Sequence, residues 1–372
     1  MKRSFAEILK EEGAAAARKA AAKMPQWALT EGMEYPGSLC LEQCSGTATA
    51  LYKASLLASR GPLGGIADLT GGLGVDSWAF AGKFERVLYF ERNSDLAGAA
   101  GRNFARLGVD NICVRAQAFD LEQTKEFAPD WIYLDPARRS AAGRKVFLLE
   151  DCEPDVLALM PELRAITPRL MLKLSPMADI TMLRRRLGAP LREIHIVCTG
   201  GEVKELLCIL GDENPGPAAL TLCSDGALLD IDEAACEGAG YVLPKAGEVL
   251  LEPCAGLLKS GAFDLPRRRW GLGKLDRFTH LYVTGGTPGE SLLPFFKLFE
   301  ILEVLPLGKA EIAAAGRKYP RAEVSARGIP MSSEELRSRL GAKTGSDIHI
   351  FGCTACASRL LLVCRKSLDT RD

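Results

Sequence analysis

Two acidic residues, Asp68 and Asp76, flank the glycines of the stretch "IADLTGGLGVDSWAFA", residues 66–81. The stretch continues a β-rich run and leads into a helical pattern, which is the setting of a nucleotide-binding loop. A pyrophosphate at the positive end of a helix would be repelled by Asp76, whereas a cationic ligand would be attracted by Asp68 and Asp76. S-adenosylmethionine fits this requirement, because it joins an adenosine to a sulfonium and an ammonium without any phosphate. The structural alternative is that Asp76 caps the helix and Asp68 ends a strand.

The glycines of this loop allow the backbone to approach a ligand closely. Against the dinucleotide pattern G-x-G-x-x-G, Gly72 and Gly74 match but Ser77 occupies the third position. A dinucleotide-dependent oxidoreductase is therefore the weaker interpretation. The loop residues predicted to contact the cofactor are Asp68, Thr70, Gly71, Gly72, Gly74 and Asp76.

Further acidic residues follow the next two β-rich runs. Glu91 in "YFERN" lies about twenty residues after the loop, where Rossmann folds carry the carboxylate that binds the ribose hydroxyls. Arg92 beside it is assigned to the same cofactor site. Asp120 in "AQAFD" can accept a hydrogen bond from an adenine amino group, and Phe119 offers an apolar wall. A surface glutamate and a turn aspartate are the structural alternatives.

The fourth β-rich run ends in "YLDPARRS", residues 133–140. Proline restricts its own backbone and that of the preceding residue, so this turn can aim the Asp135 carboxylate and the Pro136 carbonyl at an exocyclic amine. Methyl transfer is an in-line displacement that depends on such positioning, which makes these two residues the catalytic candidates. Arg138 and Arg139 suit contacts to phosphate or bases, or ion pairs with nearby acids.

The fifth β-rich run ends in "KLSPM", residues 173–177. Central parallel strands are buried on both faces, so Lys173 requires a carboxylate partner, and Asp135 is the candidate. Lys173 and Ser175 are assigned to the substrate side of the site. Glu202 and Lys204 belong either to the same rim or to an exposed hairpin.

The elements that must position these residues are short β-rich runs alternating with helical segments. The runs lie at residues 65–70, 86–91, 111–117, 131–135 and 169–175. This alternation predicts right-handed βαβ units and a parallel, doubly wound sheet. Residues 192–199 and 204–210 are too close together for a crossover helix, so they should form an antiparallel hairpin at the edge of the sheet.

The pattern divides the chain into four regions. We expect an N-terminal helical region at 1–60, a cofactor-binding domain at 61–215, a small β-rich domain, with a ferredoxin-like fold as one option, at 216–287, and an α+β unit at 288–372. The linker signal "GDENPGPAA" separates the second region from the third. In the last unit, Ser332 or Ser333 followed by Glu334 and Glu335 predicts the start of a helix.

Composition leaves the partner open, because the chain has 47 Lys+Arg and 47 Asp+Glu residues. No apolar run approaches the roughly 20 residues that span a bilayer, and the N-terminal segment does not have the pattern of a signal peptide, so we expect a cytoplasmic protein without a membrane partner. The one CxxC pair, Cys353 and Cys356, lacks a second pair, so no metal is predicted.

Together these motifs resemble the class I S-adenosylmethionine-dependent methyltransferases that carry a C-terminal THUMP-like domain. The resemblance rests on "DLTGGLGVD", "YFERN", "YLDPARR", "LEDCEP", "LKLSPMADI" and "EVKELL" in this order, and on "LEQCSGTATALYKA", "FKLFEILEVLP" and "PRAEVSARGIPMS" toward the two ends. It implies an α/β fold with a Rossmann-like, seven-stranded sheet, parallel with an antiparallel edge hairpin. It also implies an N-terminal helical segment, a C-terminal α+β THUMP-like region and S-adenosylmethionine as cofactor.

THUMP domains are RNA-binding modules of tRNA-modifying enzymes, so the resemblance implies methylation of a base nitrogen in structured RNA, either tRNA or rRNA. One departure concerns the target motif, because amino-group methyltransferases commonly place an aromatic residue after Asp/Asn-Pro-Pro to stack on the flipped base. Here Ala137 follows Pro136, and Arg138, Tyr133, Trp78 or Phe119 would have to stack instead. The alternatives are methylation of a protein or small molecule, and a non-catalytic RNA-binding protein with a methyltransferase fold.

Overall fold

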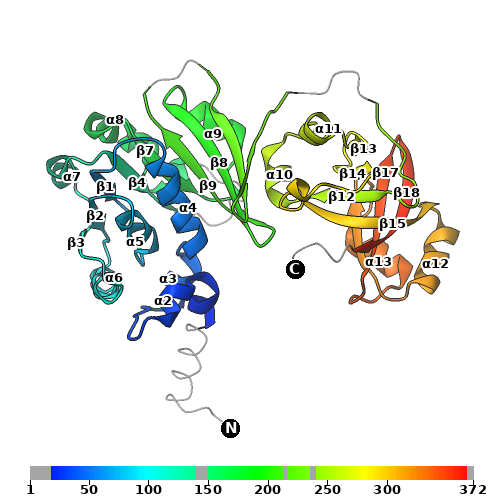
Figure 1. The fold of residues 1–372 in the computed structure, drawn as a ribbon, viewed down its shortest axis with the longest axis horizontal. Coiled ribbons are helices and arrows are strands. Elements are labelled where there is room, and N and C mark those ends of the chain that lie inside the picture. The colour runs from blue at the N-terminus through cyan, green and yellow to red at the C-terminus, as the bar shows by residue number, and fades with distance from the viewer. Residues whose placement is uncertain (1–17, 139–148, 213–215, 235–239, 367–372) are drawn as a thin grey trace, which may run out of the picture. The chain divides into compact units, whose positions relative to one another are not determined.

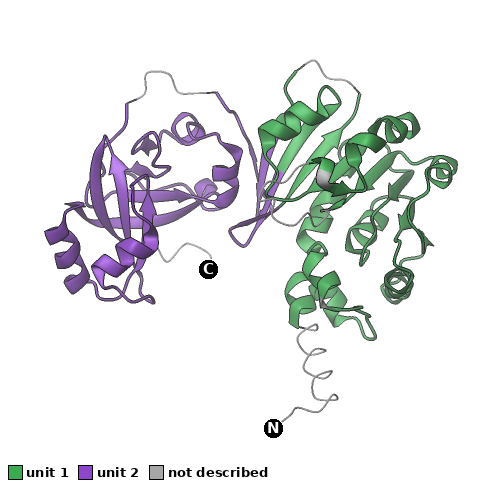
Figure 2. Cartoon of the chain, turned by 180° about the vertical axis from the view of Figure 1, so that it is seen from behind, with its two compact units in different colours: residues 1–195, 205–219 green, residues 196–204, 220–372 purple. Residues whose placement is uncertain are grey.

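The computed structural model describes residues 18–138, 149–212, 216–234 and 240–366. The chain divides into two compact units, one formed by residues 1–195 and 205–219 and the other by residues 196–204 and 220–372 (Figure 2). Each unit is described by itself below.

The first unit is built on parallel strands that alternate with helices, as the sequence predicts (Figure 1). The parallel strands are β1 (Gly65–Asp68), β2 (Arg86–Phe90), β3 (Ile112–Arg115), β4 (Trp131–Leu134) and β7 (Leu170–Leu174). The hairpin strands are β8 (Leu191–Thr199) and β9 (Glu202–Leu210), and β9 pairs antiparallel with β7. The doubly wound sheet and its antiparallel hairpin are therefore confirmed.

The complete sheet has the strand order β11-β10-β8-β9-β7-β4-β1-β2-β3. Its last seven members reproduce the predicted methyltransferase arrangement. The two others, β10 (Ala219–Ser224) and β11 (Ala227–Asp230), form an antiparallel pair next to β8; apart from Ala219 their residues are assigned to the second unit, as are residues 196–204 of the β8–β9 hairpin. The sequence pattern assigns both strands to the following β-rich region, because the two-residue turn at Asp225 and Gly226 does not indicate which sheet its two strands join.

Helices cover the sheet of the first unit. They are α2 (Pro25–Leu29), α3 (Ser38–Gln43), α4 (Thr47–Ala58), α5 (Val75–Ala81), α6 (Ser94–Arg106), α7 (Leu121–Phe127), α8 (Val156–Ile166) and α9 (Ile180–Leu187). Side chains of Asn93, Asp155 and Asp179 accept hydrogen bonds from the first turns of α6, α8 and α9, which fixes where these helices begin. A short ladder of β5 (Ala137–Arg138) and β6 (Cys152–Glu153) and a 3₁₀ turn, η1 (Leu149–Asp151), complete the unit.

The N-terminal helix α4 packs against α5, the helix that follows the glycine loop. Ala50, Ala54 and Leu57 of α4 are fully buried, so its apolar face is part of the core. Lys53 lies on the same face and is also fully buried. The N-terminal region therefore brings a cation into the interior of the first unit.

The second unit contains a seven-stranded sheet with the order β13-β14-β12-β15-β18-β17-β16. Its strands are β12 (Val249–Pro253), β13 (Gly273–Lys274), β14 (Tyr282–Thr284), β15 (Phe296–Pro306), β16 (Glu323–Arg327), β17 (Ile348–Ala355) and β18 (Ser358–Lys366). Its helices are α10 (Ala255–Ser260), α11 (Leu265–Trp270), α12 (Lys309–Lys318) and α13 (Ser333–Leu340), with a 3₁₀ turn η2 (Glu290–Leu292). Because β12 pairs with β15, one sheet runs through both regions that the sequence analysis separates after residue 287.

The start of α13 confirms the predicted capping signal, since the Ser332 hydroxyl accepts a hydrogen bond of 3.0 Å from the Glu335 N–H. In the described part of the chain, no helix is long and apolar enough to cross a membrane.

Candidate functional site

The carboxyl ends of β1, β2, β4 and β7 meet at one edge of the sheet, and each is followed or ended by a side chain that the sequence analysis selected. Asp68 ends β1, Glu91 follows β2, Asp135 follows β4, and Lys173 lies near the end of β7. Leu134 and Leu172 are register partners, which places the next residues, Asp135 and Lys173, side by side. Ligands bind at this edge in open α/β sheets.

The glycine loop is held by the acid that precedes it. Asp68 accepts hydrogen bonds from the Thr70 N–H at 3.0 Å and the Ser77 hydroxyl at 2.6 Å. Burial raises the pKa of Asp68 to about 7, although both hydrogen bonds oppose the shift. Gly72 and Gly74 have φ angles of 55° and 87°, in the left-handed region that favours glycine. Asp68 therefore fixes the conformation of the glycine loop that follows it, through hydrogen bonds to residues on both sides of the glycines.

Gly71 and Gly72 are required for different reasons. A Cβ at Gly71 would lie 2.1 Å from the ring of Tyr89, so this position serves close packing. A Cβ at Gly72 would meet nothing nearer than the Thr70 carbonyl at 3.9 Å. Open space next to backbone in a left-handed conformation is what a loop that faces a ligand provides.

Glu91 joins the end of β2 to the glycine loop. One carboxylate oxygen accepts from the Gly72 N–H at 2.9 Å and the other from the Asn93 N–H at 2.7 Å. Tyr89 adds a bond of 2.5 Å from its hydroxyl to the Gly72 carbonyl. Each carboxylate oxygen keeps a second lone pair, so Glu91 remains able to accept hydrogen bonds from two ribose hydroxyls.

Two further predicted cofactor residues, Asp120 and Arg92, have structural partners of their own. Asp120 caps α7 by accepting from the Gln123 N–H at 2.8 Å, which is the turn role weighed as an alternative. Arg92 forms an exposed ion pair of 2.8 Å with Glu153. Phe119 is half-buried. Their contacts with a cofactor stay predictions.

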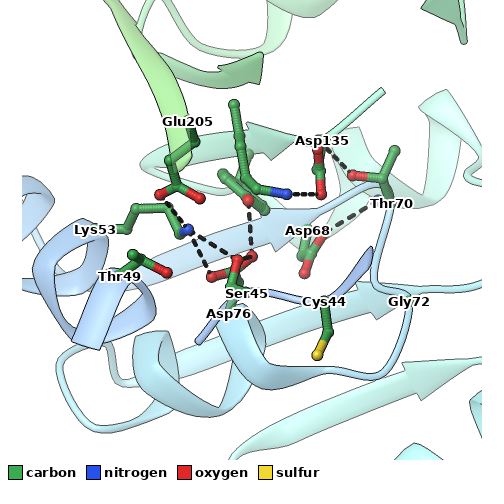
Figure 3. A network of polar contacts seen from close by, with 12 residues as sticks. Cys44, Ser45, Thr49, Lys53, Asp68, Thr70, Gly72, Asp76, Asp135 and Glu205 are labelled. Atoms are coloured by element: carbon green, nitrogen blue, oxygen red, sulfur yellow. Dashed lines mark hydrogen bonds and ion pairs between the residues drawn. The ribbon is translucent and has the colours of Figure 1, made fainter. Parts of the chain in front are cut away.

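Asp76 lies in a buried polar cluster that the sequence analysis did not foresee (Figure 3). One of its oxygens accepts from the Ser45 and Tyr133 hydroxyls, both at 2.8 Å, and the other lies 3.1 Å from the Lys53 ammonium. Burial favours the neutral acid, but Lys53 and Lys173 outweigh it and lower the pKa of Asp76. The acid is therefore ionised and already has a cation of this chain as its partner.

Lys53 connects three parts of the first unit. Its ammonium lies 2.7 Å from a Glu205 oxygen on β9, 3.1 Å from Asp76 on α5 and 2.9 Å from the Ser45 hydroxyl before α4. Its side chain is completely buried and that of Glu205 is 4% exposed. Figure 3 shows the ammonium pointing between the two carboxylates. Neither Lys53 nor Ser45 was predicted as a site residue; the available signal was a charged residue within the apolar pattern of α4.

The Asp135 turn and Lys173 form the ion pair that the sequence analysis expects. The Lys173 ammonium donates a hydrogen bond to one Asp135 oxygen, and the Asp135 N–H donates to the Thr70 hydroxyl at 2.6 Å. Pro136 is buried behind this turn. Ser175 directly follows β7, and its hydroxyl accepts a hydrogen bond from the Met177 N–H at 3.2 Å.

Two predicted substrate residues cannot be placed. Arg138 belongs to β5, but its side chain lies outside the described residues, as does the whole of Arg139. Among the residues that the structure describes, no group of three or more His, Cys, Asp or Glu side chains is arranged to hold a metal ion.

Comparisons with known proteins support the fold. The sequence matches the model of a THUMP domain-like family over residues 296–366 and that of a ferredoxin-like domain over residues 250–287. The crystal structure of a candidate methyltransferase from Porphyromonas gingivalis W83 superposes with a TM-score of 0.81 at 30% identity, and the alignment covers 96% of this chain and 89% of that one.

Other solved structures are similar over about half of the chain. An rRNA methylase from Streptococcus thermophilus has a TM-score of 0.33 at 14% identity, with 44% of this chain and 95% of that one covered. The human methyltransferase 10 domain containing protein has a TM-score of 0.37 at 13% identity, with 55% and 99% covered. Similarity at this level carries no functional argument. No curated protein matches the sequence.

Proposed function

Because the chain belongs to the class I S-adenosylmethionine-dependent methyltransferase family with a C-terminal THUMP-like domain, we propose that it transfers a methyl group from S-adenosylmethionine to a base nitrogen of structured RNA, tRNA or rRNA. The observation that carries the proposal is the convergence of Asp68, Glu91 and Asp135, from three separate strands, around the glycine loop. A cytoplasmic location follows from the proposed substrate.

The residues at the sheet edge suit this cofactor. Glu91 has lone pairs for the ribose hydroxyls, and the backbone at Gly72 faces open space. Asp135 adds a partly exposed carboxylate for a ligand that carries a sulfonium and an ammonium, whereas Lys53 already compensates the charge of Asp76 and burial raises the pKa of Asp68 to about 7. We assign Asp120 and Phe119 to the adenine. When bound, the cofactor supplies an electrophilic methyl group, and the chain supplies orientation and charge.

Support for an RNA substrate comes from the second unit. Its THUMP-like match covers residues 296–366, and the preceding ferredoxin-like segment exposes an aromatic ring with a cation beside it. The Phe278 side chain is 70% exposed, and the Arg277 guanidinium lies 5.3 Å from its ring centroid. Exposed aromatic rings next to arginines stack on unpaired bases. We propose that residues 61–215 perform the chemistry and that residues 216–287 and 288–372 hold the RNA.

Calorimetry with three variants tests the cofactor site. We expect Glu91→Ala to weaken S-adenosylmethionine binding at least tenfold, because two ribose hydrogen bonds and the anchor of Gly72 are lost together. Asp135→Ala should bind the cofactor normally but lose methyl transfer. Glu126→Ala is the matched control, since Glu126 is exposed on α7.

Three outcomes would reject parts of the proposal. An unchanged affinity in Glu91→Ala would reject the ribose assignment, and wild-type protein that binds no S-adenosylmethionine would favour the non-catalytic alternative. Methylation of protein or small molecules, with none of RNA, would favour the second enzymatic alternative.

A further inference from the structure

Asp135 and Lys173 place an anion and a cation side by side at the mouth of the proposed site. They lie at the ends of adjacent parallel strands, and the ammonium donates a hydrogen bond to one carboxylate oxygen. The two side chains are 33% and 13% exposed, so the carboxylate is the more accessible member. The Asp135 backbone is fixed by its bond to Thr70. The pair is therefore held in place rather than mobile at the surface.

Each member of the pair has unused hydrogen-bonding capacity. Within the described residues, Lys173 has a single hydrogen bond, to Asp135, which leaves two of its three N–H groups. The second oxygen of Asp135 accepts no hydrogen bond from the described chain. A ligand here would meet one acceptor and one charged donor next to each other. That arrangement complements a ring N–H beside a carbonyl group.

The surrounding charges keep Lys173 a donor. Burial alone would lower the pKa of its ammonium, but the carboxylates of Asp135, Asp76 and Glu205 outweigh burial and raise it above the ordinary value. An ammonium that remains protonated cannot act as a base. It can stabilise negative charge that develops on an oxygen within reach.

We propose that the methylated atom is a ring imide nitrogen flanked by a carbonyl, N1 of guanine or N3 of uracil, with Asp135 as base and Lys173 as stabiliser of the carbonyl oxygen. This proposal rests on the proposed function and narrows its substrate. When an exocyclic amine attacks through its lone pair, positive charge grows on nitrogen, and a nearby ammonium disfavours it. When an imide loses its proton, negative charge moves to the carbonyl oxygen, where the ammonium favours it.

The atoms and charges of this step balance. The imide proton passes to the free Asp135 oxygen, and the nitrogen forms a bond to the methyl carbon. The carbon–sulfur bond of the donor breaks, and its electron pair stays on sulfur, which changes from a sulfonium to a neutral thioether. The ammonium keeps its proton throughout, and the proton on Asp135 leaves to water.

Nucleoside analysis tests the choice of atom. RNA from cells that lack the gene is incubated with the full-length protein and S-adenosylmethionine, digested and analysed by mass spectrometry. We expect 1-methylguanosine or 3-methyluridine. Methylation of an exocyclic amine of adenine, cytosine or guanine would overturn this inference while the proposed function stands. If no RNA nucleoside gains a methyl group, the proposed function fails and the inference fails with it.

Variants of Lys173 test the role of the ammonium. Removing a donor that stabilises a developing oxyanion costs about 10²-fold in kcat, so we expect that loss for Lys173→Met and partial recovery for Lys173→Arg. S-adenosylhomocysteine affinity, measured by calorimetry, should change less than threefold in both, which also shows that the site is folded. Lys83→Met, at an exposed position, is the control and should keep full activity. A Lys173→Met protein with the parental kcat would refute the role of the ammonium.

Discussion

The buried ion cluster around Lys53 makes a quantitative prediction about stability. Lys53→Met removes the cation but preserves most of the side-chain volume, so Asp76 and Glu205 remain buried without their shared partner. Breaking a buried ion pair from one side costs about 3 to 5 kcal/mol, because an uncompensated charge is left behind. Asp76 keeps the Ser45 and Tyr133 hydroxyls, whereas Glu205 has no second ion-pair partner among the described residues. We therefore expect most of the cost to arise at Glu205.

The assay is urea denaturation followed by tryptophan fluorescence. Trp27, Trp78 and Trp131 lie in the first unit and Trp270 in the second, so the signal is dominated by the unit that contains Lys53. Two controls separate burial from charge. Lys19→Met removes an exposed ion pair with Glu42, 46% and 54% exposed, and should cost less than about 1 kcal/mol.

The second control removes the negative charge of Glu205, which has lost its ion-pair partner in Lys53→Met. In a Lys53→Met background, Glu205→Gln should recover about 1 kcal/mol or more, the desolvation cost of one unmatched polar group. If Lys53→Met destabilises the protein no more than Lys19→Met, or if Glu205→Gln gives no recovery, the assignment of Lys53 as the central counter-charge is wrong.

Three further predictions concern the loop, its acid and the second unit. Because folding raises the pKa of Asp68 from 3.8 to about 7, its stabilising contribution is complete below about pH 4 and is lost as the pH rises toward 7. The unfolding free energy of Asp68→Asn should therefore fall less steeply than that of the parent over this range in urea titrations; parallel curves would contradict the shift. Gly71→Ala, whose Cβ would overlap the Tyr89 ring, should destabilise the protein by about 1 to 3 kcal/mol in thermal unfolding, whereas Gly82→Ala, with 3.5 Å to its nearest neighbour, should not. Phe278→Ala should weaken RNA binding by about 1 to 3 kcal/mol in filter-binding assays if this ring stacks on a base, and equal affinity would remove it from the interface.

The sequence was most informative about strands and their ends. Alternation of β-rich and helical segments predicted the parallel strands, because periodicity is a local property of the chain. The partnership of Asp135 and Lys173 also followed, since both end adjacent strands and a buried lysine requires a carboxylate.

The ion cluster could not be predicted because its members are far apart in the chain. Ser45 and Lys53 come from the N-terminal region and Glu205 from β9; Lys53 and Glu205 lie within apolar patterns that indicate core, and Ser45 lies in a short polar segment before α4. For the same reason, the sequence suggests only a ligand or a helix cap for Asp76, although Lys53 already compensates its charge. Pairing of distant strands, such as β12 with β15, likewise depends on tertiary packing that no local pattern encodes.

The central claim is most directly tested by transfer of a radiolabelled methyl group from S-adenosylmethionine to RNA extracted from cells that lack the gene. We expect label in RNA with the wild-type protein and none with Asp135→Ala. Absence of label with both proteins, or equal label with both, would contradict it.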